Sequence, residues 1–222
     1  MSVKDTSIGA WFVSTYRKLT RLLFFKSSGT YWEERYKKGG NSGAGSYNEL
    51  AEFKAEIINN FVQENNVKSV MEFGCGDGNQ IKYFQFEQYT GYDISETVVN
   101  ICRNLYKNDA SKTFKLVGEH KTRTADLTMS LDVIYHLIED DTYHNYMEKL
   151  FTTADKYVII YSSNSNVNHH SAAHVRHREF TTWVQEHAKN FNLIKQIPNK
   201  YNYNREDKAN TSFADFYIFE KI

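Results

Sequence analysis

The segment EFGCGDG, residues 72–78, restricts what this chain can fold into more than any other feature. It overlaps the end of a short apolar stretch at 68–73 and places three glycines at alternate positions. Because glycine has no Cβ, such a segment lets the chain turn sharply out of a strand and approach a ligand closely. A helix predicted from about Asn79 would direct free N–H groups at that ligand and favour an anionic group. Asp93 follows Gly74 by 19 residues, about the spacing at which a doubly wound sheet holds a ribose diol.

Apolar stretches typical of strands alternate with helix patterns along most of the chain. The predicted strands lie at 68–73, 89–94, 113–119, within 125–135, and at 156–162, 191–197 and 213–221. This alternation implies a mostly parallel sheet with helices on both faces. No helix separates the last two strands, so one of them must run antiparallel to the others. We therefore expect an α/β, Rossmann-like sheet of seven mostly parallel strands with the last strand antiparallel.

Two helices have clear start signals. Ser46, with Glu49 three residues later, forms a capping box ahead of a helix predicted over 47–63. Ser95 is the predicted cap of a second helix, which follows the second strand.

A second glycine cluster at 39–45 divides the chain into an N-terminal helical arm or lid, residues 1–45, and a domain at 46–222. Within the arm, 8–25 is a basic amphipathic pattern. It fits a helix that lies on a membrane surface, or one that packs on its own domain or a second subunit. The oligomeric state is left open by this pattern. No apolar run approaches the roughly 20 residues that span a bilayer.

The charge balance and the cysteine content bear on partners and location. Lys plus Arg number 27 and Asp plus Glu number 27, which gives no positive field for a nucleic acid, so a small-molecule acceptor is expected instead. Cys75 and Cys102 are too few for a disulfide framework or a cysteine-rich zinc site. We expect a reduced, cytoplasmic protein.

The glycine segment also identifies a family resemblance. Glu72 and the three glycines match the E/D-x-G-x-G-x-G motif of class I methyltransferases, whereas Asn79 stands where the nicotinamide fingerprint needs a glycine. With VMEFGCGDGNQ, TGYDIS and LTMSLDVIYHLIEDD in order, residues 65–221 resemble that superfamily. The resemblance implies S-adenosylmethionine as cofactor and S-adenosylhomocysteine as product. The cofactor-binding residues that it implies are Glu72, Phe73, Gly74, Cys75, Gly76, Asp77, Asp93, Ile94, Gly118, Glu119 and Leu131.

The catalytic candidates follow the fourth predicted strand: Asp132, Tyr135 and His136. A sulfonium methyl is already electrophilic, so the protein must mainly align the reactants, and a base is needed only if the acceptor loses a proton. His136 has a suitable intrinsic pKa for that base, or it caps the next helix. Asp132 either orients His136 or meets the cofactor's amino group.

The run Glu139-Asp140-Asp141 has two interpretations. The carboxylates could hold a divalent metal for catechol-type methylation, or they could begin a helix, where negative charge suits the helix dipole. We favour the helix start and expect no metal.

Two segments are candidates for binding the acceptor. The stretch 162–180 is rich in histidine and arginine, and three of its histidines would share a face if it were helical. It fits an anion site, a zinc site or a polar surface, and the superfamily's use of this stretch to cover the acceptor favours the anion site. The arm is the expected opposite wall, able to close over the cofactor, or else a tether for the first helix of the domain. The candidate acceptor-binding residues are Tyr31, Trp32, Tyr47, His169, His170, His174, Arg176 and Arg178. The three histidines that would share a helical face are His170, His174 and His177.

A narrower resemblance concerns the acceptor. YWEERYKKGG in the arm, DVIYHLIEDD and HVRHREF resemble methyltransferases from bacterial surface-polysaccharide gene clusters, some associated with O-methyl phosphoramidate decoration of capsules. This implies O-methylation of an anionic acceptor such as a sugar, nucleotide-sugar or phosphoramidate. The alternatives are another small metabolite, or a non-catalytic scaffold or partner subunit that binds the cofactor. Nucleic-acid methylation is disfavoured, since no D/NPPY-type motif follows the fourth strand.

Overall fold

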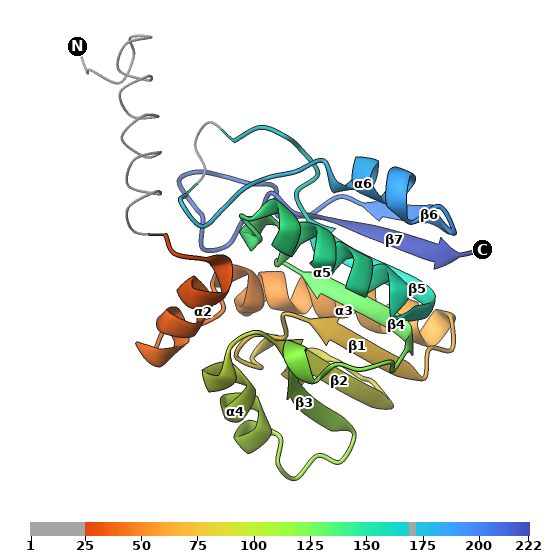
Figure 1. The fold of residues 1–222 in the computed structure, drawn as a ribbon, viewed down its shortest axis with the longest axis horizontal. Coiled ribbons are helices and arrows are strands. Elements are labelled where there is room, and N and C mark those ends of the chain that lie inside the picture. The colour runs from red at the N-terminus through yellow and green to blue at the C-terminus, as the bar shows by residue number, and fades with distance from the viewer. Residues whose placement is uncertain (1–24, 169–171) are drawn as a thin grey trace.

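The structure, a computed structural model, describes residues 25–168 and 172–222 of the 222-residue chain. Seven strands form one sheet in the order β3-β2-β1-β4-β5-β7-β6 (Figure 1). The strands are β1 Ser69–Phe73, β2 Gln88–Asp93, β3 Lys112–Leu116, β4 Ala125–Leu131, β5 Ala154–Ser162, β6 Phe191–Ile197 and β7 Asp215–Lys221. β1 to β5 are mutually parallel, whereas β7 is antiparallel to its neighbours β5 and β6. The predicted sheet is confirmed, including its antiparallel last strand.

Helices cover both faces of this sheet. They are α2 Ser28–Lys37, α3 Asn48–Glu64, α4 Glu96–Leu105, α5 Asp140–Thr152 and α6 Phe180–His187. Ile159 of β5 packs in one hydrophobic cluster with α3 and α4, while the next residue, Ile160, packs in a second cluster with α5 and α6. Side chains alternate between the faces of a strand, so two separate cores result.

Part of the predicted amphipathic helix at 8–25, together with His169 and His170, lies outside the described residues. Within the described part of the chain, no helix is long and apolar enough to cross a membrane.

The helix predicted after the glycine segment is replaced by a short 3₁₀ turn, Gln80–Tyr83. Asn59 of α3 ends this turn: its Nδ2 donates to the Tyr83 carbonyl (2.9 Å) and its Oδ1 accepts from the Gln85 N–H (3.0 Å). The amide of Asn59 therefore occupies backbone groups that a longer helix would pair with one another. The prediction of a helix here was wrong because a contact from a distant segment stops it.

Two predicted helix starts have different outcomes. Ser95 caps α4 as expected, because its Oγ accepts from the Val98 N–H at 3.2 Å. The Ser46 capping box is absent: Ser46 ends a 3₁₀ turn, Ala44–Ser46, and Tyr47 occupies the cap position of α3 without a side-chain hydrogen bond. The Ser46 carbonyl instead accepts from Nδ2 of Asn79 at 2.6 Å, which holds this turn against the glycine segment.

The segment 172–179 is not helical, so the histidine face predicted for it does not form in the described residues. It runs beside the loop between β4 and α5, where the Arg176 N–H donates to the Tyr135 carbonyl at 2.7 Å. The acidic run behaves as favoured from the sequence, since α5 begins at Asp140 directly after Glu139.

The carboxyl ends of the parallel strands gather the predicted site. The Gly74 N–H donates to the Tyr92 carbonyl (2.7 Å), which joins the exits of β1 and β2, and the Asp132 N–H donates to the Tyr161 carbonyl (2.9 Å), which joins those of β4 and β5. α2 lies beside this edge of the sheet (Figure 1).

Gly91 provides a test of the packing under the glycine segment. It pairs with Glu72 across β1 and β2, and a Cβ at Gly91 would lie 2.9 Å from Cβ of Cys75 and 3.0 Å from the Tyr89 hydroxyl. We expect Gly91→Ala to lower the free energy of unfolding by about 1–3 kcal/mol because the core is already filled. Gly118→Ala is the control, since nothing lies within 4 Å of its added Cβ. Urea denaturation followed by circular dichroism measures both, and equal losses would contradict the packing argument.

Candidate active site

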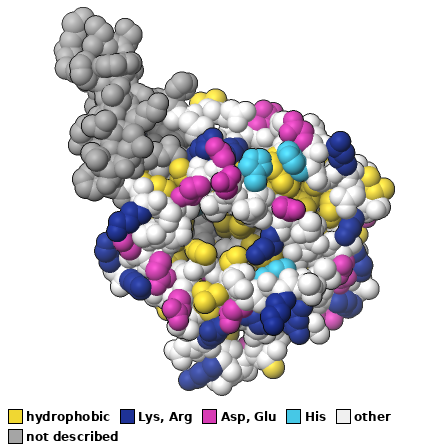
Figure 2. Space-filling model, in the orientation of Figure 1, with side chains coloured by type: hydrophobic (Ala, Val, Ile, Leu, Met, Phe, Trp, Pro, Cys, Tyr) yellow, Lys and Arg dark blue, Asp and Glu magenta, His cyan; other side chains and the backbone are white. Residues whose placement is uncertain are grey.

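A cavity of about 330 Å³ opens at the carboxyl edge of the sheet, and Figure 2 shows the hollow with hydrophobic side chains at its floor. Its size falls in the range of small-molecule sites. Elements far apart in the sequence meet in its wall: α2, the glycine segment, and the ends of β2 and β4. The predicted site residues that line it are Trp32, Glu72, Phe73, Gly74, Cys75, Gly76, Asp93, Ile94, Leu131, Asp132 and His136.

The glycine segment approaches its neighbours too closely for larger residues. Gly74 and Gly76 have φ values of 86° and 61°, in the left-handed region that favours glycine. A Cβ at Gly74 would lie 2.5 Å from Cγ2 of Val133, and one at Gly76 would lie 2.3 Å from Oγ of Ser42. The two glycines therefore allow the chain that leaves β1 to pack closely against Val133 and Ser42 in the cavity wall.

The backbone N–H groups of this segment are largely occupied within the protein. The Gly76 N–H donates to Oδ2 of Asp93 (3.0 Å), and the Asp77 N–H donates to Oγ of Ser42 (2.8 Å). The Asn79 N–H donates to Oδ1 of Asp77 at 3.1 Å. The expected row of free helix N–H groups facing an anion is therefore absent, which follows from the loss of the helix itself.

Asp93 is buried at the end of β2 and lines the cavity. Its Oδ1 accepts from the Ser95 N–H at 2.9 Å and its Oδ2 from the Gly76 N–H. Burial raises the pKa of Asp93 to about 6, although the backbone hydrogen bonds act in the opposite direction. Each carboxylate oxygen accepts more than one hydrogen bond, so the ionised group can also accept from the two hydroxyls of a diol.

Glu72 is a second buried carboxyl group in the cavity wall. Only 3% of it is exposed, and its Oε2 accepts from the Tyr89 hydroxyl at 2.6 Å. Burial raises the pKa of Glu72 to about 7.

Asp132, at the exit of β4, has φ 60° and is held by two partners. Nζ of Lys54 donates to its Oδ2 (2.7 Å), and the Tyr135 hydroxyl donates to its Oδ1 (2.8 Å). Lys54 is only 1% exposed and also lies 5.2 Å from the ring centroid of Tyr161. His136 directs its Nδ1 to the His174 carbonyl and not to this carboxylate, so Asp132 does not orient it through Nδ1, one of the two roles predicted for Asp132.

Lys54 was missed by the sequence analysis although a signal existed. It lies four residues after Leu50 and four before Ile58, within the apolar face of α3. A lysine in such a stripe needs a buried acidic partner, and Asp132 provides it. Other cavity residues that the sequence analysis did not single out include Ser28, Tyr36, Gln80, Val117 and Tyr146.

His136 has a defined tautomer. Its Nδ1 lies 2.8 Å from the His174 carbonyl, which can only accept, so Nδ1 carries the proton and Nε2 keeps its lone pair. Burial lowers the pKa of His136 to about 4, so the ring is neutral near pH 7. Its ring contacts Trp32 edge-on, with 4.9 Å between centroids, and stacks on His174 at 5.3 Å. A neutral imidazole with an available lone pair is thus placed in the cavity wall.

The arm forms one wall of the cavity, and α2 is attached at its middle and at its N-terminal end. Ser95 Oγ donates to Glu33 (2.5 Å) and Thr97 Oγ1 donates to the same carboxylate (2.8 Å), which with Lys37 lowers the pKa of Glu33 to about 2. At the N-terminal end of α2, the N–H and Oγ of Ser28 donate to Glu139 at 2.9 and 2.7 Å. These contacts join parts of the chain that the sequence pattern does not relate, so they were not predicted.

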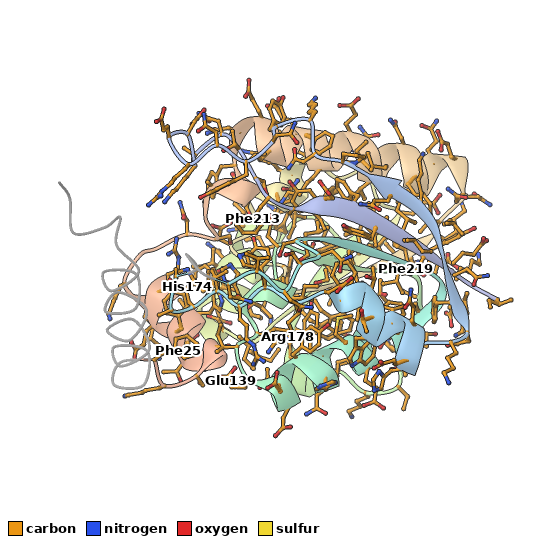
Figure 3. All side chains as sticks on the ribbon, turned by 90° about the horizontal axis from the view of Figure 1, so that it is seen from above. Phe25, Glu139, His174, Arg178, Phe213 and Phe219 are labelled. Carbon is orange, nitrogen blue, oxygen red and sulfur yellow. The ribbon has the colours of Figure 1, made fainter. Side chains whose placement is uncertain are left out.

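The two arginines predicted to bind the acceptor lie outside the cavity wall. Both pair with Asp140, Arg176 at 2.8 Å and Arg178 at 3.0 Å. Both also donate to carbonyls of the loop before α5: Arg176 to Ile138, and Arg178 to Leu137 and Ile138. Figure 3 shows Arg178 and His174 in this region together with Glu139. The guanidinium groups fasten the loop, because its irregular backbone leaves carbonyls that need donors.

The other predicted site residues within the described part of the chain also lie outside the cavity wall. Tyr31 stacks on His174, with 4.6 Å between centroids, and the Tyr47 hydroxyl donates to Asp77 at 2.8 Å. Tyr135 is buried behind Asp132. Gly118 and Glu119 form part of a 3₁₀ turn, whose first residue, Val117, reaches the cavity instead. No cluster of three metal-ligating side chains occurs within 25–168 and 172–222.

Solved structures with the same fold include several methyltransferases. The methyltransferase domain of bacterial CtHen1-C is 19% identical, covering 78% of this chain and 99% of that one, with a TM-score of 0.58. The N-methyltransferase NodS from Bradyrhizobium japonicum WM9, in complex with S-adenosylhomocysteine, is 11% identical, covering 77% and 85%, with a TM-score of 0.61. The magnesium protoporphyrin IX methyltransferase from Synechocystis PCC 6803, with the same bound product, is 14% identical, covering 94% and 99%, with a TM-score of 0.61.

Sequence comparisons give a family but no characterised relative. No curated protein sequence matches the chain. Residues 47–201 match the family described as "Methyltransferase domain". This match includes the glycine segment, Asp93, Asp132 and His136, and it spans more than half of the chain. The chain therefore belongs to the methyltransferase-domain family.

Proposed function

We propose that this chain binds S-adenosylmethionine in the cavity and transfers its methyl group to an oxygen atom of a small polar acceptor. The observation that carries the proposal is the neutral His136 ring, whose Nδ1–H is fixed by the His174 carbonyl and whose Nε2 has no hydrogen-bond partner within the described residues and can accept a proton. The alternative of a non-catalytic scaffold gives no reason for this arrangement.

Different residues of the cavity wall fit different portions of the cofactor. Asp93 would accept from the ribose hydroxyls, since its carboxylate retains acceptor capacity beyond the two backbone bonds. Ile94, Val117 and Leu131 would supply apolar contacts to the base. Glycine at 74 and 76 lets the backbone form this part of the wall, because a Cβ there would collide with Val133 or Ser42.

The cofactor supplies a methyl group on a sulfonium sulfur, and displacement by the acceptor oxygen leaves S-adenosylhomocysteine. The proton of the acceptor hydroxyl passes to Nε2 of His136. We assign the alignment of the reactants and the exclusion of water to the arm, since Trp32 and Tyr36 of α2 line the same cavity.

The low pKa of His136 supports oxygen as the acceptor atom. A hydroxyl oxygen that gains a methyl group becomes an oxonium, whose proton is far more acidic than an imidazolium proton, so a weak base is sufficient. A methylated amine keeps its proton more tightly than imidazolium, and a histidine with pKa about 4 would not remove it. The base therefore matches a hydroxyl better than an amine.

The cations near the site bear on the charge of the acceptor. Lys54 is paired with Asp132, and both arginines predicted to bind an anion are paired with Asp140. Lys149, however, lines the cavity and forms no ion pair within the described residues, so one cation there is available to an anionic acceptor. The family match does not support a capsule-type acceptor. A nucleic-acid acceptor is part of the test, because one similar structure is the small RNA methyltransferase HEN1.

The role of Asp93 predicts a pH-dependent affinity for S-adenosylhomocysteine. The ionised carboxylate accepts hydroxyl hydrogen bonds and the protonated form accepts fewer, so affinity should fall as the pH is lowered through about 6. Asp93→Asn should weaken binding at pH 8 by roughly 10- to 100-fold, the value of one or two charge-assisted hydrogen bonds. Isothermal titration calorimetry measures both effects. Asp155→Asn, on an exposed residue, is the control, and a wild-type pH profile in Asp93→Asn would contradict the assignment.

The state of His136 predicts a distinct NMR signature. We expect long-range ¹H–¹⁵N spectra to show a neutral ring protonated on Nδ1 between about pH 5 and pH 8, with protonation only near pH 4. The His136→Gln variant assigns the resonance. A ring protonated on Nε2 near pH 7 would exclude the base.

The same variant tests catalysis once an acceptor is found. Labelled S-adenosylmethionine with wild-type protein is screened against hydroxylated metabolites, nucleotide-sugars, phosphoramidates and RNA. On the acceptor that is labelled, His136→Gln should lower turnover by roughly 10²- to 10⁴-fold and leave affinity for S-adenosylhomocysteine within a few-fold of wild type. Unchanged turnover would dismiss the base, and cofactor binding with no labelled acceptor would favour the scaffold.

A further inference from the structure

One face of α5 lines the cavity with polar side chains. Thr142, Asn145 and Lys149 follow one another at helical spacing, so they project on the same side of the helix. Tyr146 lies between them, and its hydroxyl donates to the Phe73 carbonyl at 2.6 Å. By contrast, the other three side chains form no hydrogen bond or ion pair within the described residues. Thr142 and Asn145 are exposed and Lys149 is half-buried, so a ligand can reach all three.

The space beside this face of α5 is open because no α-helix joins β3 to β4. Parallel strands are normally connected through a helix that packs on the sheet. Here the link 117–124 contains the 3₁₀ turn Val117–Glu119 and no α-helix, and it crosses the sheet on the side of α5 (Figure 1). His120 holds the link on the sheet, since its ring meets Phe73 and Tyr92 edge-on with 5.6 and 5.2 Å between centroids. A ligand can therefore lie along α5 where a helix would otherwise pack.

The charge around Lys149 is positive. Burial lowers the pKa of His120, and the nearby positive charges of Lys149 and Lys115 lower it further. The carboxylate next to His120 in the chain, that of Glu119, is paired with Arg103 at 3.2 Å. Neither Lys149 nor Lys115 forms an ion pair elsewhere in the described part of the chain. This end of the cavity therefore favours an anionic ligand, which would balance charge that the protein leaves uncompensated.

The proposed cofactor does not bring an anion to this place. Its anionic group, the methionine carboxylate, lies at one end of the molecule, the adenine lies at the other end, and the ribose lies between them. In the proposed arrangement the ribose meets Asp93 and the base meets Val117, the first residue of the link. The portion of the cofactor beside the link is therefore the uncharged base. An anion beside Lys149 has to come from the other reactant, the acceptor.

We propose that the acceptor carries an oxyanion, phosphate or carboxylate, which Lys149 binds together with the amide of Asn145 one turn earlier on α5. This inference rests on the proposed function, since it names the class of acceptor for the same cavity. Lys149 lies two helical turns, about 10 Å, along α5 from Thr142, and the loop that carries His136 precedes this helix. The anionic group and the reacting hydroxyl are therefore at separate ends of the acceptor, and Lys149 is a specificity-determining residue.

Inorganic phosphate and acetate are the probes for this site. Each is titrated into protein saturated with S-adenosylhomocysteine, and sodium chloride at equal ionic strength is the control. The readout is the NMR titration of His120, assigned with His120→Gln, because a bound anion favours the charged ring and raises its pKa. We expect at least one of the two oxyanions to raise the pKa of His120 in the wild-type protein. Lys149→Met should weaken the apparent affinity for that oxyanion roughly 10-fold, the value of one charge-assisted hydrogen bond.

Matched variants separate the site from a general effect of charge. Lys149→Met should by itself raise the pKa of His120 in the absence of phosphate, because it removes a neighbouring positive charge. Lys149→Arg keeps the cation and should retain the response to the oxyanion within a few-fold. Lys189→Met changes an exposed lysine outside the cavity wall and should behave as the wild type. Isothermal titration calorimetry should show that all three variants bind S-adenosylhomocysteine within about twofold of wild type.

The acceptor screen gives a second test. On an acceptor that is labelled, Lys149→Met should raise KM roughly 10-fold and leave kcat within a few-fold of wild type, because the anion lies away from the reacting oxygen. Efficient labelling of an acceptor that has no anionic group would overturn the inference and leave the proposed function standing.

The binding outcomes distinguish the inference from the proposed function. An unchanged phosphate response in Lys149→Met would show an adventitious ion only and overturns the inference, and so does the absence of a response to either oxyanion. A roughly 10-fold loss of affinity for S-adenosylhomocysteine in Lys149→Met also overturns it, because the cation would then serve the cofactor. In each of these cases wild-type binding of S-adenosylhomocysteine leaves the proposed function standing. A wild-type protein that does not bind S-adenosylhomocysteine refutes the proposed function, and the inference fails with it.

Discussion

The form of the cavity depends on one carboxylate, that of Asp93. It holds the Gly76 N–H at 3.0 Å and the Ser95 N–H at 2.9 Å, and the Ser95 hydroxyl continues the connection to Glu33 of the arm at 2.5 Å. The glycine segment, the end of β2 and the arm are therefore linked by one short path of hydrogen bonds. Since the carboxylate is buried, loss of any bond would leave a costly unpaired group, and the three segments keep a fixed relation.

The sheet could be predicted because hydrophobic patterning is local, whereas the exceptions come from contacts between distant segments. Apolar runs located all seven strands, and the lack of a helix pattern before the last one indicated the antiparallel pairing. The helix expected after the glycine segment is stopped by Asn59, which precedes it by 20 residues or more. Similarly, Ser46 has the sequence of a cap, but Asn79 binds its carbonyl and the capping box does not form.

The same difference between local sequence patterns and contacts from distant segments applies to the candidate site. The motif placed Gly74, Gly76 and Asp93 at one cavity because their spacing encodes the crossing from β1 to β2. Arg176 and Arg178 could not be judged from sequence, since their partners are carbonyls of an irregular loop, and their charge is used to fasten that loop. From sequence, Glu33 could not be told from any exposed helical glutamate. In the structure its carboxylate, on α2, accepts hydrogen bonds from Ser95 and Thr97 at the start of α4.

The buried pair of Lys54 and Asp132 has a consequence for the medium in which a methyl group would move. The two charges lie 2.7 Å apart and cancel at a distance, so this side of the cavity adds little net field. Methyl transfer from a sulfonium to an uncharged atom spreads one positive charge over a longer line of atoms at the transition state. Water solvates the concentrated charge of the starting state better than the dispersed one, so exclusion of water from this side of the cavity would lower the barrier without any group having to move.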